Sequence, residues 1–285
     1  MAKAWLTGFG DEIDPSLEIQ MRHMESLGIY AIELRGVDGK NVSQLTTVEA
    51  KEIRRRMTAQ GFSVSALGSP IGKTDITAPF EQVLETFKRL LETADILHTN
   101  VMRIFSFYIP DGKYALCRNE VIERLGALVD LAKQGDVLLY HENESGIYGD
   151  TSDRCVDLIQ NVNDESFALI YDPSNFVQSG HDPLAAWFVM KPYVRYLHMK
   201  DSHAPCPGTD AHSENPHCVV GDGDGRLREV LTDIAQTGWT GYFSVEPHLG
   251  SSRHVPGTAI EKWAAAANGL KKLLAECGIS VEKPV

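Results

Sequence analysis

The sequence predicts an α/β protein in which a single domain, residues 1–285, folds as a (β/α)8 TIM barrel. Two observations support this prediction. Short apolar runs alternate with longer segments that carry apolar residues at helical spacing, and this alternation continues through the whole chain. Strict alternation of strands and helices implies a parallel sheet, because parallel neighbours need crossover connections that helices supply. Eight such units close a barrel.

The first four strand-and-helix units occupy the N-terminal half of the chain. Each strand run is short and apolar, and glycine follows the first two helices at Gly28 and Gly61, in the position of a C-cap. We expect the strands at 4–10, 29–35, 62–67 and 101–105, and the helices at 15–27, 48–60, 80–97 and 119–134.

Four more units fill the C-terminal half. The longest loop follows the seventh strand and contains the run Gly221-Asp222-Gly223-Asp224-Gly225. An open doubly wound sheet has similar content, but Gly8-Phe9-Gly10-Asp11 lacks the third glycine of its phosphate-binding turn. We expect the strands at 137–140, 167–171, 194–198 and 241–245, and the helices at 152–162, 184–189, 227–236 and 260–277.

The composition narrows the class of protein. The net charge of −12 argues against nucleic acid as a partner, because phosphate binding depends on a basic patch. No window approaches the ~18 to 20 apolar residues of a membrane span, and the N-terminus lacks the layout of a signal peptide. The 5 cysteines are scattered without a CxxC pair, which is typical of reduced thiols. We therefore expect a cytoplasmic protein without a nucleic-acid or membrane partner.

Strands five to eight each end in a side chain that can bind a metal, namely Glu142, Asp172, His198 and Glu246. The carboxyl ends of barrel strands converge, so these side chains are expected to be neighbours. Like charges ~4 Å apart repel by roughly 4 kcal/mol at an effective dielectric of 20, so three carboxylates need a compensating cation. The alternative, in which each residue separately caps a helix or forms a surface salt bridge, does not explain four matching strand ends.

We therefore predict one divalent metal ion as cofactor. Three carboxylates and one imidazole, with no thiolate, suit Mn²⁺, Mg²⁺, Co²⁺, Fe²⁺ or Zn²⁺. Mn²⁺ is favoured among these ions.

Four motifs carry a resemblance to a known family. They are Tyr140-His141-Glu142-Asn143, Tyr171-Asp172-Pro173-Ser174-Asn175, His198-Met199-Lys200-Asp201 and Ser244-Val245-Glu246-Pro247. In order and spacing they resemble the metal-ligand strands of the xylose-isomerase-like TIM-barrel superfamily of sugar isomerases and epimerases. Gly221 to Asp224 is similar to a glycine-acidic loop that many members carry after strand seven. The superfamily also includes inosose dehydratases, hydroxypyruvate isomerases, other lyases and a DNA-repair endonuclease branch.

The resemblance implies a divalent-metal-dependent isomerase or epimerase acting on a sugar or polyol. In such enzymes the metal binds adjacent carbonyl and hydroxyl oxygens of a ketose and stabilises the enediolate that forms after proton abstraction. Glu142 and Glu246 are the implied catalytic pair, working from opposite faces of the substrate as base and acid. The alternatives are a lyase or dehydratase of the same fold and, from another class, a non-catalytic sugar-binding protein.

Two departures from the family pattern bear on this expectation. Epimerases of this type usually carry a second histidine three residues after the strand-six aspartate, and here that residue is Asn175. This difference weakens the epimerase assignment. Strands two to four offer only Glu33 and Arg103 as further ligands or charges, which argues against a trinuclear zinc endonuclease.

Further residues are expected to bind the substrate or support the ligands. Lys200 lies two residues beyond His198, on the same face of a strand. His141 and Glu144 flank Glu142 and are candidates for proton relay or for holding it in place. The loop histidines are expected in solvent, and the apolar loop surface is compatible with a homo-oligomer. The expected substrate-binding residues are Glu33, Arg103, His141, Glu144, Asn175 and Lys200, and the loop histidines are His203, His212, His217 and His248.

Overall fold

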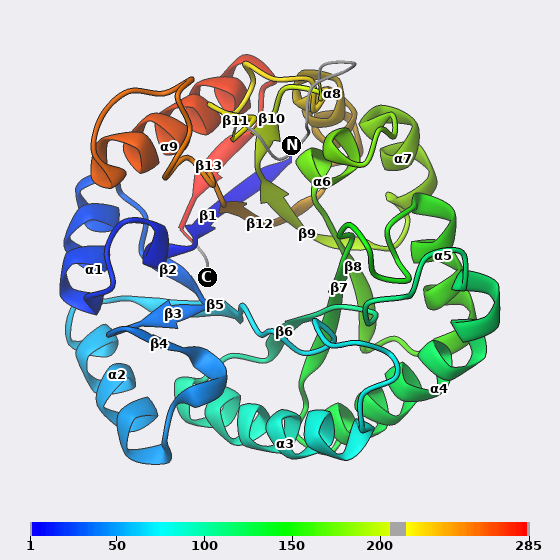
Figure 1. Ribbon diagram of the computed structural model, residues 1–285. Helices are drawn as coiled ribbons and strands as arrows, with labels where there is room; N and C mark the ends of the chain where they lie inside the picture. Colours follow the sequence, from blue (N-terminus) through cyan, green and yellow to red (C-terminus); the bar gives the residue numbers. More distant parts are fainter. Residues whose placement is uncertain (1, 206–214, 284–285) are drawn as a thin grey trace.

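The computed structural model describes residues 2–205 and 215–283 and confirms the (β/α)8 barrel. Figure 1 looks along the axis of a ring of strands that is surrounded by helices. Each predicted strand is present within a few residues of the expected bounds. The barrel strands are β1 (Lys3–Gly8), β2 (Ala31–Leu34), β5 (Ser63–Leu67), β6 (Val101–Ile104), β7 (Leu138–Glu142), β8 (Phe167–Tyr171), β9 (Val194–Met199) and β12 (Thr240–Val245).

The barrel strands are parallel and follow the order of the chain around the ring. The hydrogen-bonded sheet runs β13-β1-β12-β9-β8-β7-β6-β5-β2. β1 and β2, the first and last of the eight barrel strands in this series, lie against each other and complete the ring (Figure 1). Next to this seam, the Thr7 and Ser65 hydroxyls share a hydrogen bond of 2.7 Å. The sequence analysis missed β13 (Ser280–Glu282), which pairs in parallel with the start of β1.

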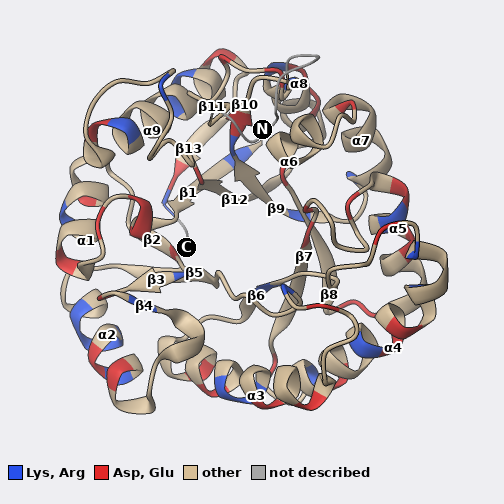
Figure 2. Ribbon diagram, in the orientation of Figure 1, with Lys and Arg blue, Asp and Glu red and all other residues tan. Residues whose placement is uncertain are grey.

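The helices cover the outside of the ring. They are α1 (Leu17–Ser26), α2 (Thr47–Ala59), α3 (Phe80–Leu97), α4 (Tyr114–Lys133), α5 (Ser152–Val162), α7 (Pro183–Met190), α8 (Leu227–Thr237) and α9 (Ala259–Glu276). α2 and α9 each begin with a capping box, formed by Thr46 with Glu49 and by Thr258 with Glu261. Figure 2 shows acidic and basic residues interleaved along these helices. No described helix is both long enough and apolar enough to cross a membrane.

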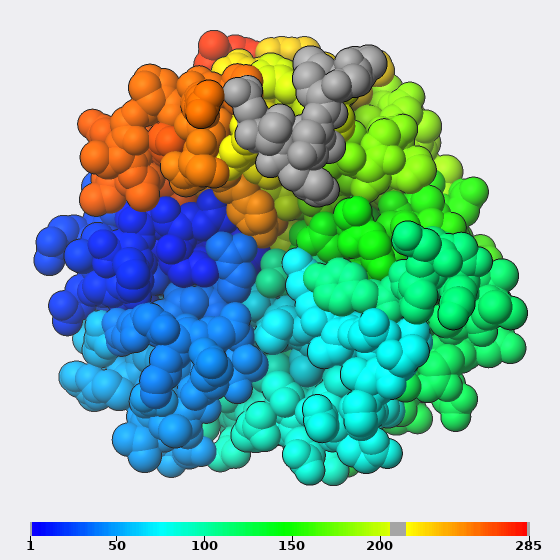
Figure 3. Space-filling model, in the orientation of Figure 1, coloured from blue at the N-terminus to red at the C-terminus, as the bar shows by residue number. Residues whose placement is uncertain are grey.

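Short elements at the strand ends shape the loops. The 3-10 helices η1 (Gly10–Glu12) and η2 (Val42–Gln44) and the short helix α6 (Pro173–Gln178) were not predicted. Two small antiparallel pairs join β3 (Gly36–Val37) to β4 (Lys40–Asn41) and β10 (Asp201–Ser202) to β11 (His217–Cys218). Figure 3 shows segments from most of the chain, from blue to orange, meeting around the barrel axis.

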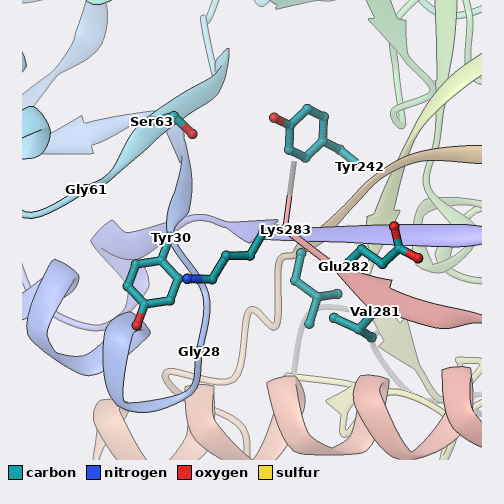
Figure 4. Close-up of a pocket in the computed structure, with 9 residues that line it drawn as sticks. Gly28, Tyr30, Gly61, Ser63, Tyr242, Val281, Glu282 and Lys283 are labelled. Carbon is teal, nitrogen blue, oxygen red and sulfur yellow. The ribbon is translucent and has the colours of Figure 1, made fainter. Parts of the chain in front are cut away.

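The apolar core lies between the sheet and the helices, while the inside of the barrel is partly polar. A small separate cluster of Ala66, Val101, Ile170 and Tyr196 fills the interior, and the Tyr196 hydroxyl lies 3.0 Å from Ser65 Oγ. A pocket of about 350 Å³ is lined by residues that begin or precede strands and by the C-terminal segment, as Figure 4 shows. This pocket lies at the amino end of the barrel, away from the predicted ligands.

Candidate metal centre

The structure brings the four predicted metal ligands together. Glu142 ends β7, Asp172 directly follows β8, His198 lies in β9 and Glu246 directly follows β12. Because β7, β8, β9 and β12 are consecutive in the sheet, their carboxyl ends place these side chains side by side. One ligand atom of each lies within 4.8 Å of the others. All four are buried, with exposed fractions of 0–2%.

His198 stands between two of the carboxylates. Its Nδ1 lies 3.2 Å from Glu142 Oε1 and 3.0 Å from Glu246 Oε2. Lys200 reaches the same cluster, with Nζ 2.7 Å from Asp172 Oδ2 and 3.7 Å from Glu246 Oε2. The three carboxylates therefore face one imidazole and one ammonium group in the protein interior.

Several atoms of the cluster lack a hydrogen bond of good geometry. Asp172 Oδ2, His198 Nδ1 and Glu246 Oε2 are buried and have no such partner within the described residues, although charged groups lie nearby. Buried polar atoms without a partner are rare, and here three of them face one another. A hard or borderline divalent cation takes carboxylate oxygen and imidazole nitrogen as ligands. The donor set and its unpartnered atoms therefore fit a divalent metal ion.

Burial and charged neighbours shift the pKa values of the four predicted ligands in different directions. Burial acts to raise the pKa of Glu142, but His198 and Arg103 outweigh it and hold that pKa below its usual range. Burial also acts to raise the pKa of Glu246, but Lys200 and His198 outweigh it and hold that pKa well below its usual range. Burial raises the pKa of Asp172 to about 7. Burial acts to lower the pKa of His198, but Glu33, Glu142 and Glu246 raise it well above normal, so this imidazole carries a proton.

A fourth carboxylate, outside the predicted ligand set, sets the orientation of His198. Glu33 is fully buried, and its Oε1 lies 3.2 Å from His198 Nε2. The Phe9 ring packs edge-on against the imidazole, with 5.3 Å between centroids. A carboxylate on one ring nitrogen directs the other nitrogen to a metal. Glu33, expected to contact substrate, therefore lies behind a predicted ligand.

The start of α6 orients Asp172. Its Oδ1 accepts a hydrogen bond of 3.1 Å from the Asn175 backbone N–H, as the N-cap of the helix, and Pro173 occupies the first turn. Asn143 and the Asp172 backbone exchange two hydrogen bonds of 2.9 Å. Asn175 Nδ2 donates to the Asn143 carbonyl at 2.8 Å and lies 3.4 Å from Glu142 Oε1. Asp172 Oδ2 is thereby left to face the cluster, and Asn175 contacts Glu142.

Arg103 holds the outer oxygen of Glu142. The Arg103 side chain is buried, its Nη1 lies 3.1 Å from Glu142 Oε2, and its Nη2 donates to the Gly68 carbonyl at 3.2 Å. Both oxygens of Glu142 therefore have polar neighbours. Glu246 Oε2 likewise has charged neighbours, with His198 Nδ1 at 3.0 Å and Lys200 Nζ at 3.7 Å, although neither contact has good hydrogen-bond geometry in the described part of the chain.

His141 and Glu144 lie apart from the cluster. Adjacent residues of a strand point to opposite faces, and His141 Nε2 lies 2.9 Å from Ser106 Oγ. Burial lowers the pKa of His141 to about 4, so it is neutral. Glu144 Oε2 accepts a hydrogen bond of 2.9 Å from Lys73 Nζ. His141 therefore lies on the outer face of β7, and Glu144 forms an ion pair with Lys73 in the loop before α3.

The glycine-acidic loop after β9 binds a carboxylate of the chain itself. The backbone N–H groups of Gly221, Gly223 and Gly225 donate to Asp201 at 2.9, 3.1 and 3.0 Å. A Cβ atom added at Gly223 would lie 2.4 Å from Asp201 Oδ1, so the close approach requires glycine there. The loop therefore closes around Asp201, just beyond Lys200.

Sequence analysis missed a second group of residues beside Glu246. Arg35 Nη1 lies 3.2 Å from Glu246 Oε1, and Arg35 Nε donates to Asp11 at 2.8 Å. His248 Nε2 lies 3.3 Å from Glu246 Oε1, and its backbone N–H donates to Glu12 at 2.7 Å. Asp11, Glu12 and Arg35 follow the first two strands, so the rule that strand ends carry the site would have found them.

These residues border an open cleft, called the mouth cleft below. Its volume is about 380 Å³, and its lining includes Glu12, Arg35, Asn215, His217, His248 and Ser251. His217 and His248 were expected in solvent, but both are partly buried because their rings pack together, with 5.3 Å between centroids. His203 is also partly buried, with its ring 5.0 Å from that of His254, and His212 lies outside the described residues.

Curated proteins with related sequences include several dehydratases. The chain is 28% identical over 265 residues to the rhizopine catabolism protein MocC of Rhizobium meliloti, an alignment that covers 86% of this chain and 78% of the relative. It is 24% identical over 248 residues to inosose dehydratase of Clostridium perfringens, covering 76% and 80%. It is 21% identical over 184 residues to 3-dehydroshikimate dehydratase of Bacillus anthracis, covering 61% and 62%.

Solved structures share the fold. IOLI protein with a bound zinc atom superposes with a TM-score of 0.78 at 16% identity, covering 95% of this chain and 98% of that one. A xylose isomerase-like TIM barrel protein from Mycobacterium smegmatis, in complex with magnesium, superposes with a TM-score of 0.70 at 17% identity, covering 96% and 98%. The family model described as xylose isomerase-like TIM barrel matches residues 21–274. The chain therefore belongs to the xylose isomerase-like TIM barrel family.

Proposed function

We propose that the protein is a divalent-metal-dependent dehydratase that removes a proton beside the carbonyl of a sugar- or polyol-derived ketone and expels a neighbouring hydroxyl group as water. The observation that carries this proposal is the buried cluster of Glu142, Asp172, His198 and Glu246, with unpartnered ligand atoms on the last three. Two of the relatives are named as dehydratases, which supports dehydration over the isomerase or epimerase activity that the sequence motifs suggested.

Glu142, Asp172, His198 and Glu246 would hold the metal ion. A bound divalent ion supplies Lewis acidity, which acidifies a C–H bond next to a carbonyl and stabilises the resulting negative charge. The zinc and magnesium named in two structural neighbours support an ion of this class, and we expect Mn²⁺.

Glu246 is the better placed of the two proposed catalytic carboxylates to act as base. Its Oε1 lies against Arg35 and His248 at the edge of the mouth cleft, while its Oε2 turns to the proposed metal ligands, and its low pKa keeps it ionised at neutral pH. Lys200, 3.7 Å away, compensates its charge. After taking the proton from carbon, Glu246 gives it to the departing hydroxyl of the neighbouring carbon, so that water leaves and a C=C bond forms.

The contacts of Glu142 favour a dehydratase over the second candidate function, an isomerase or epimerase. An epimerase needs a second carboxylate free to return a proton to the opposite face of the substrate. Glu142 Oε2 is held by Arg103 and its Oε1 lies 3.4 Å from Asn175 Nδ2. One-base dehydration fits this arrangement better than two-base epimerisation. An isomerase or epimerase stays the second candidate because Glu142 and Glu246 both lie beside His198 Nδ1, at 3.2 and 3.0 Å.

Incubation with candidate ketones in D₂O tests the proposal. The Mn²⁺-loaded protein is mixed with an inosose and, separately, with free ketoses, and the products are followed by NMR and mass spectrometry. Loss of one water with formation of an unsaturated or dicarbonyl product supports the dehydratase. Deuterium beside the carbonyl without loss of water supports the isomerase or epimerase instead. If no ketone exchanges deuterium or loses water with any of the five metals, the proposal is wrong.

A further inference from the structure

The mouth cleft contains charged groups that the proposed proton transfer does not use. It opens beside Glu246, whose Oε1 lies 3.2 Å from Arg35 Nη1 while its Oε2 faces His198. Arg35 and His248 line the cleft and both contact Glu246 Oε1, so the cleft borders the proposed reacting centre. The part of a substrate that does not react would therefore lie against Glu12, Arg35 and His248.

Every nitrogen of the Arg35 guanidinium already donates to one of the chain's own carboxylates. Its Nε donates to Asp11 at 2.8 Å, its Nη2 to Asp11 at 3.2 Å and to Glu12 at 3.1 Å, and its Nη1 to Glu246 at 3.2 Å. The guanidinium carbon also lies 4.3 Å from the centre of the Phe9 ring. A carboxylate or phosphate of a substrate would have to displace one of these partners to bind Arg35.

Other cations near the carboxyl ends of the strands are also paired. Lys73 donates to Glu144 at 2.9 Å, Arg103 to Glu142 at 3.1 Å, and Lys200 lies 2.7 Å from Asp172. The sequence of residues 206–214 contains no lysine or arginine. In the mouth itself, Asp11, Glu12 and Glu246 place three acidic groups around the single guanidinium of Arg35.

We propose that the mouth cleft binds hydroxyl groups of an uncharged, polyhydroxylated substrate and that Glu12 disfavours substrates bearing a carboxylate or phosphate. This inference rests on the proposed function, since it assigns the substrate class of the same site. The Glu12 carboxylate can accept hydrogen bonds from hydroxyl groups of a substrate. An ionised carboxylate on a substrate offers no hydrogen-bond donor and is repelled by the negative charge of Glu12. Of the two reactions named for the dehydratase relatives, the cleft therefore suits the neutral inosose and not the anionic 3-dehydroshikimate.

Binding of two unreactive probes tests this selectivity. Calorimetric titration of the Mn²⁺-loaded protein compares myo-inositol, a neutral cyclic polyol, with shikimate, a ring of similar size that carries a carboxylate. We expect myo-inositol to bind at least about tenfold more tightly than shikimate. In Glu12→Gln, which keeps the shape and removes the charge, this ratio should fall by about tenfold. Glu52→Gln, an exposed carboxylate paired with Arg55 on α2, is the matched control and should keep the wild-type ratio.

Two results would overturn the inference: wild-type protein that binds shikimate as tightly as myo-inositol, or folded Glu12→Gln protein with an unchanged ratio. The wild-type comparison decides the question alone if Glu12→Gln does not fold. Neither probe has a ketone carbonyl, so their binding does not depend on turnover. Selective binding without any reaction of ketones would refute the proposed function alone, whereas turnover of 3-dehydroshikimate in preference to inosose would refute the selectivity alone.

Discussion

At the scale of single residues, the chemistry depends on which atoms are held and which are left without partners. Glu142, Asp172 and Glu246 are all buried carboxylates, yet their surroundings give them different pKa values and different free oxygens. Arg103 occupies an oxygen of Glu142, and the N-cap bond occupies an oxygen of Asp172. Glu246 Oε1 instead lies beside Arg35 and His248 at the edge of the mouth cleft, and this difference gives the two proposed catalytic carboxylates unequal roles.

The unequal roles predict unequal effects of substitution. Glu246→Gln should lower kcat by roughly 10²–10⁴-fold, the range for loss of a general base. Glu142→Gln should act mainly through weaker metal binding, so that saturating Mn²⁺ restores part of its activity. Steady-state kinetics at increasing Mn²⁺ concentration measures both effects. Equal losses of kcat that excess metal does not change would indicate two-base chemistry instead.

Glu33 should control metal binding without touching the metal. Because its carboxylate fixes His198 with Nδ1 toward the cluster, Glu33→Ala should weaken Mn²⁺ affinity by roughly 10–100-fold, as loss of such supporting groups typically does. Titration of the metal-free protein by calorimetry measures this affinity. The control is Glu120→Gln, which removes an exposed carboxylate from α4 and should leave the affinity unchanged. A Glu33→Ala affinity equal to wild type would contradict the role.

Metal binding should also depend on pH. In the metal-free protein the pKa of His198 is raised, so the imidazole keeps its proton above the usual pKa and a metal must displace that proton. Mn²⁺ affinity should therefore rise with pH by about tenfold per pH unit for each ligand proton that is displaced, one from His198 and, below its pKa of about 7, a second from Asp172, and binding should release these protons. Titrations in buffers of different ionisation enthalpy count the released protons. Affinity that is flat from acidic to neutral pH would exclude a protonated His198.

At the scale of elements, loops and the first turns of helices orient the side chains that the strand ends place in the site. α6 starts at the residue after Asp172, and the glycine-acidic loop closes around Asp201, two short segments on either side of Lys200 in the chain. The residues of both segments could be identified in the sequence, but the residues with which they form hydrogen bonds could not. A hydrogen bond between residues 22 apart, such as Gly223 to Asp201, depends on how the loop folds back and leaves no periodic pattern.

The glycine-acidic loop gives a stability prediction. Gly223→Ala places a Cβ 2.4 Å from Asp201 Oδ1, and we expect a loss of roughly 1–3 kcal/mol in the free energy of unfolding, the range for overpacking. Gly126→Ala in α4 is the matched control, since a Cβ there meets nothing within 4 Å, and it should stabilise by about 0.5–1 kcal/mol through helix propensity. Chemical denaturation of both variants measures the difference. Equal stability of the two would contradict the close packing around Asp201.

At the scale of the whole molecule, the alternation of apolar runs and helical patterns was sufficient to predict the barrel and the side-by-side placement of four strand ends. Period-based reasoning works here because every barrel strand is buried on both faces. It failed for β13, whose exposed residues carry no apolar run, and for the first turn of α4. It also did not predict that Arg35 and His248 contact Glu246. That contact depends on ring closure, which places the first two strands next to the eighth.

The carboxyl ends of the neighbouring strands β7, β8, β9 and β12 are proposed to form a site for one divalent metal ion. The most direct measurement is the metal content of the purified protein after loading with Mn²⁺ and dialysis, by elemental analysis, for the wild type and for Asp172→Asn. We predict one Mn²⁺ per chain in the wild type and a large loss in the folded variant, with thermal unfolding of the wild type shifted upward by the bound ion. No retained metal in the wild type, with no shift in unfolding for any of the five candidate ions, would contradict the claim.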